Sequence, residues 1–267
     1  MSSYCLPIIA LGAMACATGS LAQPPASAAG PPAWGVQVGG GALVTPEFQG
    51  ASVSRVRALP YLSVRYGDVL TATVQDGIAL NLYRSGDFTA GPKARFRFGQ
   101  DENDSRDLRG LGDVDVSVEP GLFANYRRGP FSIGAEVTHD VADGHGGGIA
   151  ELDAAVTLPV ARTPSGPVLL SVGPSATFVT ARVNRAFYGV DRSQAAASGL
   201  PAYRPTGGLQ EVGMNLTAIA PVARRTTVVG LLGYGRLVGE ASDSPRVRQR
   251  GSRDQFTAGL FIAYAFF

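Results

Sequence analysis

The segment RDQFTAGLFIAYAFF, from Arg253 to Phe267, decides the fold. Its even-numbered side chains from Phe256 onward are all apolar, whereas the odd-numbered ones are polar or small until the aromatic end, apart from Phe261. Successive side chains of an extended strand point to opposite faces, so this period of two predicts a β-strand. An apolar strand at a sheet edge would recruit other chains, whereas a closed barrel has no edge. The segment therefore predicts the last strand of an outer-membrane β-barrel.

The first 33 residues predict an export signal and a linker. Residues 1–22 hold an apolar run too short to span a membrane as a mature helix, followed by Ser20-Leu21-Ala22, a site for cleavage before Gln23. A buried N-terminal helix is the alternative. Residues 23–33, rich in Pro and Ala, predict a disordered periplasmic lead-in. Because Cys5 and Cys16 lie in the leader, we expect neither disulfides nor cysteine-held metal in the mature chain.

Composition fits a barrel over residues 34–267. Charged residues make up 16% of the chain, against about 25% in typical soluble proteins. A barrel explains this shortfall, because its outer face meets lipid while its lumen is polar. The net charge of +2 is too small to indicate nucleic-acid binding. A soluble β-sandwich or lipocalin-like barrel is the alternative; its outer face would have to be polar.

Period-two patterns and turn residues predict about twelve antiparallel strands, with ten as the fallback. Their expected ranges are 34–44, 58–66, 69–75, 77–84, 88–99, 113–127, 130–142, 148–161, 167–182, 208–220, 226–238 and 253–267. Most of the odd-numbered connections between them are long and all of the even-numbered ones are short. Outer-membrane barrels have this pattern, with long external loops and short periplasmic turns.

Several segments, taken together in order, resemble the MipA/OmpV family of outer-membrane proteins. They include Arg109–Asp115 with Glu119-Pro120-Gly121, Gly144–Gly147, Phe187–Val190 and Ala197–Tyr203. The resemblance implies a cell outer-membrane barrel. It also implies a scaffold that binds a murein lytic transglycosylase and links it to a peptidoglycan synthase. The aromatic end, Tyr264, Phe266 and Phe267, is similar to the signal that barrel-assembly machinery recognises.

Enzyme chemistry finds little support in the sequence. His139 and His145, with Asp140 and Asp143, could pass for a metal cluster, but a site needs three or four converging ligands. We therefore expect structural or interface histidines. No G-x-S-x-G motif occurs and no serine lies in a nucleophile context. We expect no catalytic residues, no metal and no cofactor.

Polar side chains on the presumed inner faces are predicted to form a lumen ladder. Its members are Asp113, Asp115, Glu119, Glu136, Glu151, Asp153, Arg95, Arg97 and Arg182. One interpretation is a set of ion pairs that fixes strand register, because polar groups shut away from water need partners. The other is a polar conduit for a small solute, which would make the protein a pore or sensor.

Two long connections are expected to have external roles. The 242–253 loop carries Arg246, Arg248, Arg250 and Arg253, which could grip lipopolysaccharide phosphates or merely be solvated. The 183–207 loop carries Phe187, Tyr188 and Tyr203. Long loops without regular structure are usually functional or disordered. We expect this loop either to plug the mouth of the barrel or to act as a surface adhesive.

Overall fold

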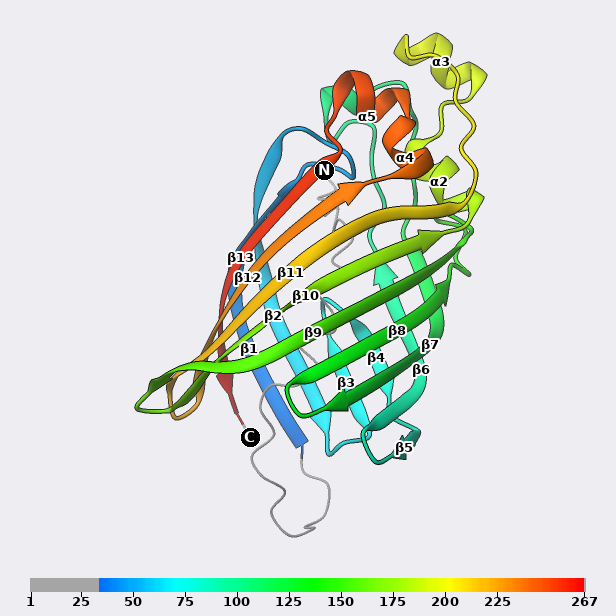
Figure 1. Ribbon diagram of the computed structural model, residues 1–267. Coiled ribbons are helices and arrows are strands. Elements are labelled where there is room, and N and C mark those ends of the chain that lie inside the picture. Colours follow the sequence, from blue (N-terminus) through cyan, green and yellow to red (C-terminus); the bar gives the residue numbers. More distant parts are fainter. Residues whose placement is uncertain (1–33, 267) are drawn as a thin grey trace.

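The computed structural model describes residues 34–266 and shows a closed antiparallel β-barrel whose mouth is covered by short helices at one end (Figure 1). The predicted signal peptide, the predicted lead-in and Phe267 lie outside the described residues. The strands are β1 (Trp34–Pro46), β2 (Ser54–Tyr66), β3 (Leu70–Thr73), β4 (Gly77–Leu80), β5 (Tyr83–Ser85), β6 (Phe88–Arg97), β7 (Ser117–Arg128), β8 (Phe131–His139), β9 (Gly148–Thr163), β10 (Gly166–Val179), β11 (Gly208–Ala223), β12 (Thr226–Leu237) and β13 (Asp254–Ala265).

These segments make twelve strands around the barrel, because β4 and β5 follow each other along the chain and both pair with β6. The last strand pairs with the first over Gln37–Val44 and Ala258–Ala265, and the β4–β6 pairing completes the ring. The prediction of about twelve antiparallel strands is thus confirmed, and ten is excluded. Closure leaves β13 with a partner on each side, which removes the apolar edge.

Side chains of β13 alternate between the outside and the interior of the barrel as predicted. Phe256 is 62% exposed and Ile262 is 55% exposed, whereas Phe261 is 2% exposed. Large apolar side chains also cover the outer faces of the other long strands. An apolar outer surface is what a lipid-facing barrel needs, so the soluble alternative was wrong.

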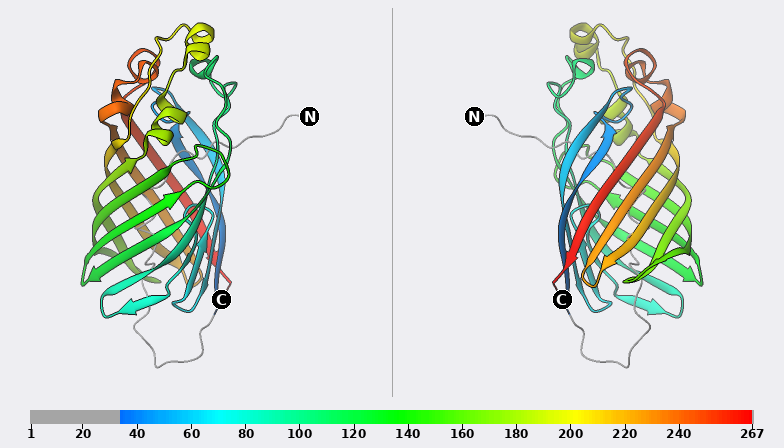
Figure 2. Two further views of the ribbon diagram at one scale, coloured as in Figure 1. Left: turned by 90° about the vertical axis from the view of Figure 1, so that its right-hand side faces the viewer. Right: turned by 90° about the vertical axis from the view of Figure 1, so that its left-hand side faces the viewer.

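The two ends of the barrel differ as the connection lengths predicted. The connections at residues 86–87, 129–130, 164–165 and 224–225 have two residues each and lie at the end that holds the C-terminus (Figure 2). The opposite end carries helices α2 (Ala181–Tyr188), α3 (Arg192–Ser198), α4 (Gly239–Asp243) and α5 (Pro245–Arg250), and the 3-10 helix η2 (Arg106–Leu108). We assign the first end to the periplasm and the second to the exterior.

Two predicted external loops contain helices instead. In the 183–207 segment, α3 begins with a capping box, in which Asp191 accepts from the Gln194 backbone and the Gln194 side chain accepts from Asp191. It ends at Gly199, whose φ of 76° is a left-handed conformation. The sequence contains both the capping residues and the terminating glycine, but the segment between them has no extended pattern of apolar residues with the period of a helix. In the 242–253 segment, α5 begins with Pro245, a residue suited to the first helical turn.

The strand predicted to start at Asp113 starts at Ser117. Residues 113–116 form the end of an external loop, in which Val114 is bridged to Gln100. The inside-outside alternation therefore begins only after Val116. Among the described residues, no helix combines the length and the hydropathy that crossing a membrane requires.

Candidate functional site

The interior of the barrel has an apolar side and a charged side. Strands β1, β2 and β11–β13 supply the apolar side, a cluster of Leu43, Leu59, Tyr61, Ile219, Val229, Leu231, Phe261 and Ala263. Strands β6–β9 supply the charged side. There, alternate residues of β6 place Lys93, Arg95 and Arg97 on the inner face, opposite Glu119, Glu136 and Glu151 of the next three strands.

These six residues, the ion-pair layer, carry three positive and three negative charges within a few ångströms. Arg95 contacts all three carboxylates: its guanidinium nitrogens lie 2.8 Å from Glu136, 3.3 Å from Glu151 and 3.6 Å from Glu119. Arg97 Nε lies 2.7 Å from Glu119 Oε1, and Lys93 contacts Glu136. Their side chains are at most 7% exposed. Burial of this depth is tolerated because each charge has partners of opposite sign.

A histidine from an external turn completes the layer. His145 Nε2 lies 2.9 Å from Glu119 Oε1, and its Nδ1 accepts a hydrogen bond from the backbone N–H of Gly147. Nδ1 therefore carries no proton, so Nε2 carries it and donates to the carboxylate. Thr138 Oγ1 lies 3.3 Å from Glu119 Oε2. Glu119 thus has partners on both oxygens.

Asp140 shapes the turn that delivers His145. Its Oδ1 accepts from the Ala142 N–H at 2.9 Å and its Oδ2 accepts from the Gly146 N–H at 2.8 Å. Burial by itself raises the pKa of Asp140, but these two backbone donors outweigh it and lower the pKa below its usual value. The anionic form of Asp140 is therefore the form that holds the turn.

Helices cover the external mouth. Phe187 and Tyr188 of α2 pack with Val114, Ile149, Leu237 and Val247 in an apolar cluster above the ion-pair layer. Arg246 of α5 ties this cap together: it donates to Phe187 O, lies 2.7 Å from Gln100 Oε1, and its guanidinium carbon is 4.5 Å from the centre of the Phe48 ring. Burial lowers the pKa of Arg246 to about 10, so it still carries its charge at neutral pH.

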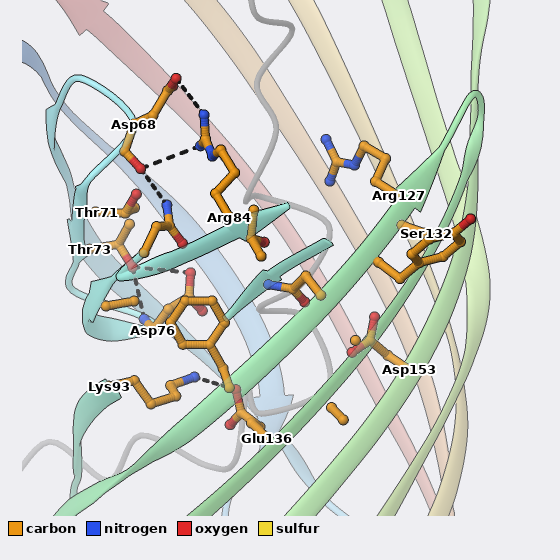
Figure 3. A pocket seen from close by; sticks show the side chains of 18 of the residues that line it. Asp68, Thr71, Thr73, Asp76, Arg84, Lys93, Arg127, Ser132, Glu136 and Asp153 are labelled. Atoms are coloured by element: carbon orange, nitrogen blue, oxygen red, sulfur yellow. Dashed lines mark hydrogen bonds and ion pairs between the residues drawn. The ribbon is translucent and has the colours of Figure 1, made fainter. Parts of the chain in front are cut away.

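A pocket of about 390 Å³ occupies the opposite, periplasmic half of the barrel. It reaches from the turn residues Asp68 and Asp87 inward to Lys93 and Glu136, where the ion-pair layer begins. Figure 3 shows Asp68, Thr73 and Asp76 on one wall and Arg127, Ser132 and Asp153 on the facing wall. We call this pocket the vestibule.

The structure separates the predicted lumen ladder into three groups. Glu119, Glu136, Glu151, Arg95 and Arg97 meet in the ion-pair layer. Asp153 lies apart from it, on the vestibule wall. Asp113, Asp115 and Arg182 were placed wrongly: the first two are exposed in the loop before β7, and Arg182, on α2, donates to Gly146 O outside the lumen. The error arose because the period of two was extended past the strand ends.

Lys93, a member of the ion-pair layer, and the contact that His145 makes with this layer were missed from sequence. Lys93 is two residues before Arg95, so the parity of β6 alone would have placed it on the same inner face. His145 had no such signal, because it comes from a turn that only the tertiary fold brings over Glu119. His139 ends β8 and is exposed, and the described residues hold no group of three acidic, histidine or cysteine side chains suited to a metal ion.

The external residues also differ in accessibility. Arg246 is buried, so it is not available to lipopolysaccharide, and Arg250 is half-buried and donates to Asp107 O and Ser198 O. Arg248 is exposed, and Arg253, also exposed, pairs with Asp243. In the other segment Tyr203 is half-buried and donates to Glu240. At the C-terminal end, the rings of Tyr264 and Phe266 lie outside the barrel, 5.2 Å apart.

A protein-family model described as MltA-interacting protein MipA matches residues 38–266, nearly all of the barrel. The chain belongs to this family. Together with the lipid-compatible outer face, membership makes the chain an outer-membrane β-barrel protein, as the sequence resemblance implied. Among curated proteins, none matches the chain.

Solved outer-membrane barrels show distant likeness. OprB from Pseudomonas putida is 13% identical, with a TM-score of 0.38; the match covers 78% of this chain and 59% of OprB. A FadL homologue from Pseudomonas aeruginosa is 10% identical, with a TM-score of 0.40 and coverage of 88% and 90%. OprG from the same organism is 11% identical, with a TM-score of 0.28 and coverage of 89% and 98%. The chain thus spans less than two thirds of OprB.

Proposed function

We propose that this protein is a non-enzymatic, non-conducting outer-membrane scaffold. On its periplasmic side it would bind a murein lytic transglycosylase and link that enzyme to a peptidoglycan synthase. The observation that carries the proposal is membership of the family described as MltA-interacting protein. The barrel supplies the anchor, and its turns face the compartment in which the murein enzymes work.

The closed interior supports a scaffold over a pore. A water-filled channel would leave lumen-facing carboxylates wet, yet the side chain of Glu119 is 0% exposed and that of Glu136 is 6% exposed. The helical cap adds a second barrier at the mouth. The pore or sensor remains the second candidate function, favoured only by the polar vestibule.

Basic side chains at the periplasmic rim give the scaffold a recognition surface. Arg128, Arg162, Arg224 and Arg225 are all exposed at or beside the two-residue turns. Turns this short offer little contact area, so charge would contribute much of the attraction to an acidic face of the partner. The rim would then control the rate of association more than the final affinity.

Capture of a purified murein lytic transglycosylase by the detergent-solubilised barrel tests the scaffold. We expect capture by the wild-type protein and several-fold weaker capture by the triple variant R162Q/R224Q/R225Q, with the difference shrinking at high salt. R248Q, which removes an exposed arginine at the external end, is the matched control. Planar-bilayer recording tests the pore: discrete, solute-blocked channel events without transglycosylase capture would overturn the proposal.

Lipopolysaccharide, outer-membrane lipid and the barrel-assembly machinery are further proposed partners. Of the four arginines considered for lipopolysaccharide, the exposed Arg248 and Arg253 are the ones placed to reach its phosphates. Reduced lipopolysaccharide co-purification with R248Q/R253Q would support this contact. Unchanged co-purification would remove it.

A further inference from the structure

Arg57 is a buried cation in the external half of the barrel, and it has no direct partner. It lies on the inner face of β2, is 8% exposed, and its Nε and Nη2 atoms are buried without a hydrogen-bond acceptor. Over residues 34–266, no carboxylate comes within ion-pair distance of its guanidinium. Arg95, which is buried to a similar degree, contacts three carboxylates. The chain thus leaves the charge of Arg57 uncompensated, which lowers stability.

The two atoms without acceptors lie on one edge of the guanidinium. Nε–H and Nη2–H point side by side from this edge, and together they form the fork that holds a carboxylate or phosphate in two hydrogen bonds. On the neighbouring strand, Leu43 pairs with Arg57, so Thr45 lies two residues further along the same inner face. The Thr45 hydroxyl is also buried and has no partner. An oxyanion bound here would satisfy both side chains.

Two carboxylates attract Arg57 from beyond ion-pair distance, and Asp104 is the one with an oxygen to spare. Glu47 lies 3.6 Å from Arg55 Nη2. The same nitrogen donates to Asp104 O at 2.7 Å and so holds the loop before β7 against β2. Asp104 Oδ2 is buried and has no donor. A ligand therefore needs an acidic group for the fork and a hydroxyl for Asp104, because Arg55 would repel an ammonium group.

A ligand can reach Arg57 without the displacement of a strand. β3 pairs only with Ser63–Tyr66 of β2, so within the described chain no strand lies beside residues 54–61 on that side. Figure 1 shows β3 and β4 confined to the half of the wall nearer the C-terminus. The loop that carries Asp104 contacts the external half of β2 instead. Movement of this loop would admit a small molecule from the external side.

We propose that Arg57 and Asp104 bind a small hydroxylated acid, of the class of hydroxy acids and sugar acids, inside the external half of the barrel. The Arg57 fork holds the acidic group, the Thr45 hydroxyl donates to it, and Asp104 accepts from the hydroxyl of the ligand. The site is independent of the scaffold, because it lies away from the periplasmic turns that would contact the protein partner.

Thermal unfolding of the purified, detergent-solubilised barrel with three probes at equal ionic strength tests the site. The probes are glycolate, acetate, which lacks the hydroxyl, and glycolamide, which lacks the charge. A ligand that binds only the folded barrel raises its unfolding midpoint in proportion to its affinity. We expect glycolate to bind about tenfold more tightly than acetate, since its hydroxyl adds a hydrogen bond to a charged acceptor, and glycolamide to have no effect. Equal effects of glycolate and acetate, or no effect of glycolate, would overturn the proposal without any variant.

Variants of Arg57 then assign the acid site. R57M should abolish the glycolate response and raise the midpoint of the ligand-free barrel, because an apolar side chain replaces an uncompensated buried charge. If Arg57 only supports the fold, R57M lowers that midpoint instead. R57K should respond weakly, because it keeps the charge but loses the fork. R248M, at an exposed position of α5, is the matched control. A full glycolate response in a folded R57M barrel would refute the role of Arg57.

A variant of Asp104 separates ligand binding from direct pairing. D104A should bind glycolate and acetate equally, because the acceptor for the hydroxyl is gone. If Asp104 instead pairs with Arg57 in solution, D104A lowers the midpoint and glycolate leaves the wild type unchanged, which overturns the proposal. Loss of transglycosylase capture with glycolate binding intact would reject the scaffold alone.

Discussion

His145 Nε2 and Glu119 Oε1 lie 2.9 Å apart inside the barrel, although His145 belongs to an external turn. Their side chains are both 0% exposed. One hydrogen bond therefore joins the external surface to the ion-pair layer. Because both side chains are fully buried, this contact seals part of the barrel interior, as the non-conducting scaffold proposal requires.

Replacing His145 should loosen this seal. H145A leaves a buried carboxylate oxygen short of one donor, which costs about 1–3 kcal/mol of unfolding free energy. We expect a lower temperature for the gel-mobility change that marks barrel unfolding. H139A is the matched control, because His139 is exposed at the end of β8 and should leave the temperature unchanged. Equal behaviour of the two variants would show that the hydrogen bond adds no stability.

Breaking the charge balance of the ion-pair layer should have a larger effect. E136A leaves Lys93 and Arg95 without one shared partner, and an uncompensated buried charge costs about 3–5 kcal/mol. The double variant K93M/E136M restores neutrality and should recover part of that loss in urea unfolding. R236A removes the exposed pair with Asp254 and should leave stability almost unchanged. If K93M/E136M is less stable than E136A, restoring neutrality does not compensate for the lost ion pair.

Acid should open the turn that carries His145. The folded-state pKa of Asp140 is lowered, so its contribution is present above the unfolded pKa of about 4 and is lost as pH falls through the folded value. Amide hydrogen exchange at Gly146 should therefore accelerate as the pH is lowered below about 4, relative to the intrinsic rate. D140N should show fast exchange at neutral pH as well. D143N, at an exposed position with φ of 60° that suits asparagine, is the control.

The seam between the first and last strands should not tolerate an added methyl group at Gly41. A Cβ there would lie 2.2 Å from Leu260 O and 2.5 Å from Phe261 Cδ1. G41A should lower the yield of folded barrel, with an overpacking cost of about 1–3 kcal/mol. G40A is the neighbouring control, since its Cβ would come no closer than 3.6 Å to Leu59 O. Comparable folded yields for both variants would show that the seam adjusts.

Removing Arg246 should loosen the external cap while leaving the barrel intact. R246Q gives up the contact with Phe48 and the hydrogen bonds to Phe187 and Gln100. We expect faster proteolysis within residues 181–207 of the folded protein, by about tenfold. R248Q changes an exposed arginine of the same helix and should match the wild type. If residues 181–207 of R246Q resist proteolysis as well as those of the wild type do, the apolar cluster alone holds the cap.

The sequence by itself determined the barrel and the difference between its two ends. Alternation along β13, with Phe256 outward and Gln255 inward, follows from the fixed two-residue period of a strand, which is a local property. The lengths of the connections then distinguished the end of the barrel with long loops from the end with short turns. The same local rule placed Arg95, Arg97 and Glu119 inside, since each belongs to a regular strand.

Tertiary structure decided what those inward side chains do. The partners of Glu119 come from two neighbouring strands and from the turn holding His145, so no spacing in the sequence relates them. The two-residue rule does not apply to residues beyond strand ends, such as Asp113, because the direction of their side chains depends on how the loop packs. Likewise, Arg246 is buried because two loops, which carry Phe48 and Gln100, and helix α2, which carries Phe187, close around it. The burial of Arg246 depends on all of these segments together, so no single segment of the sequence predicts it.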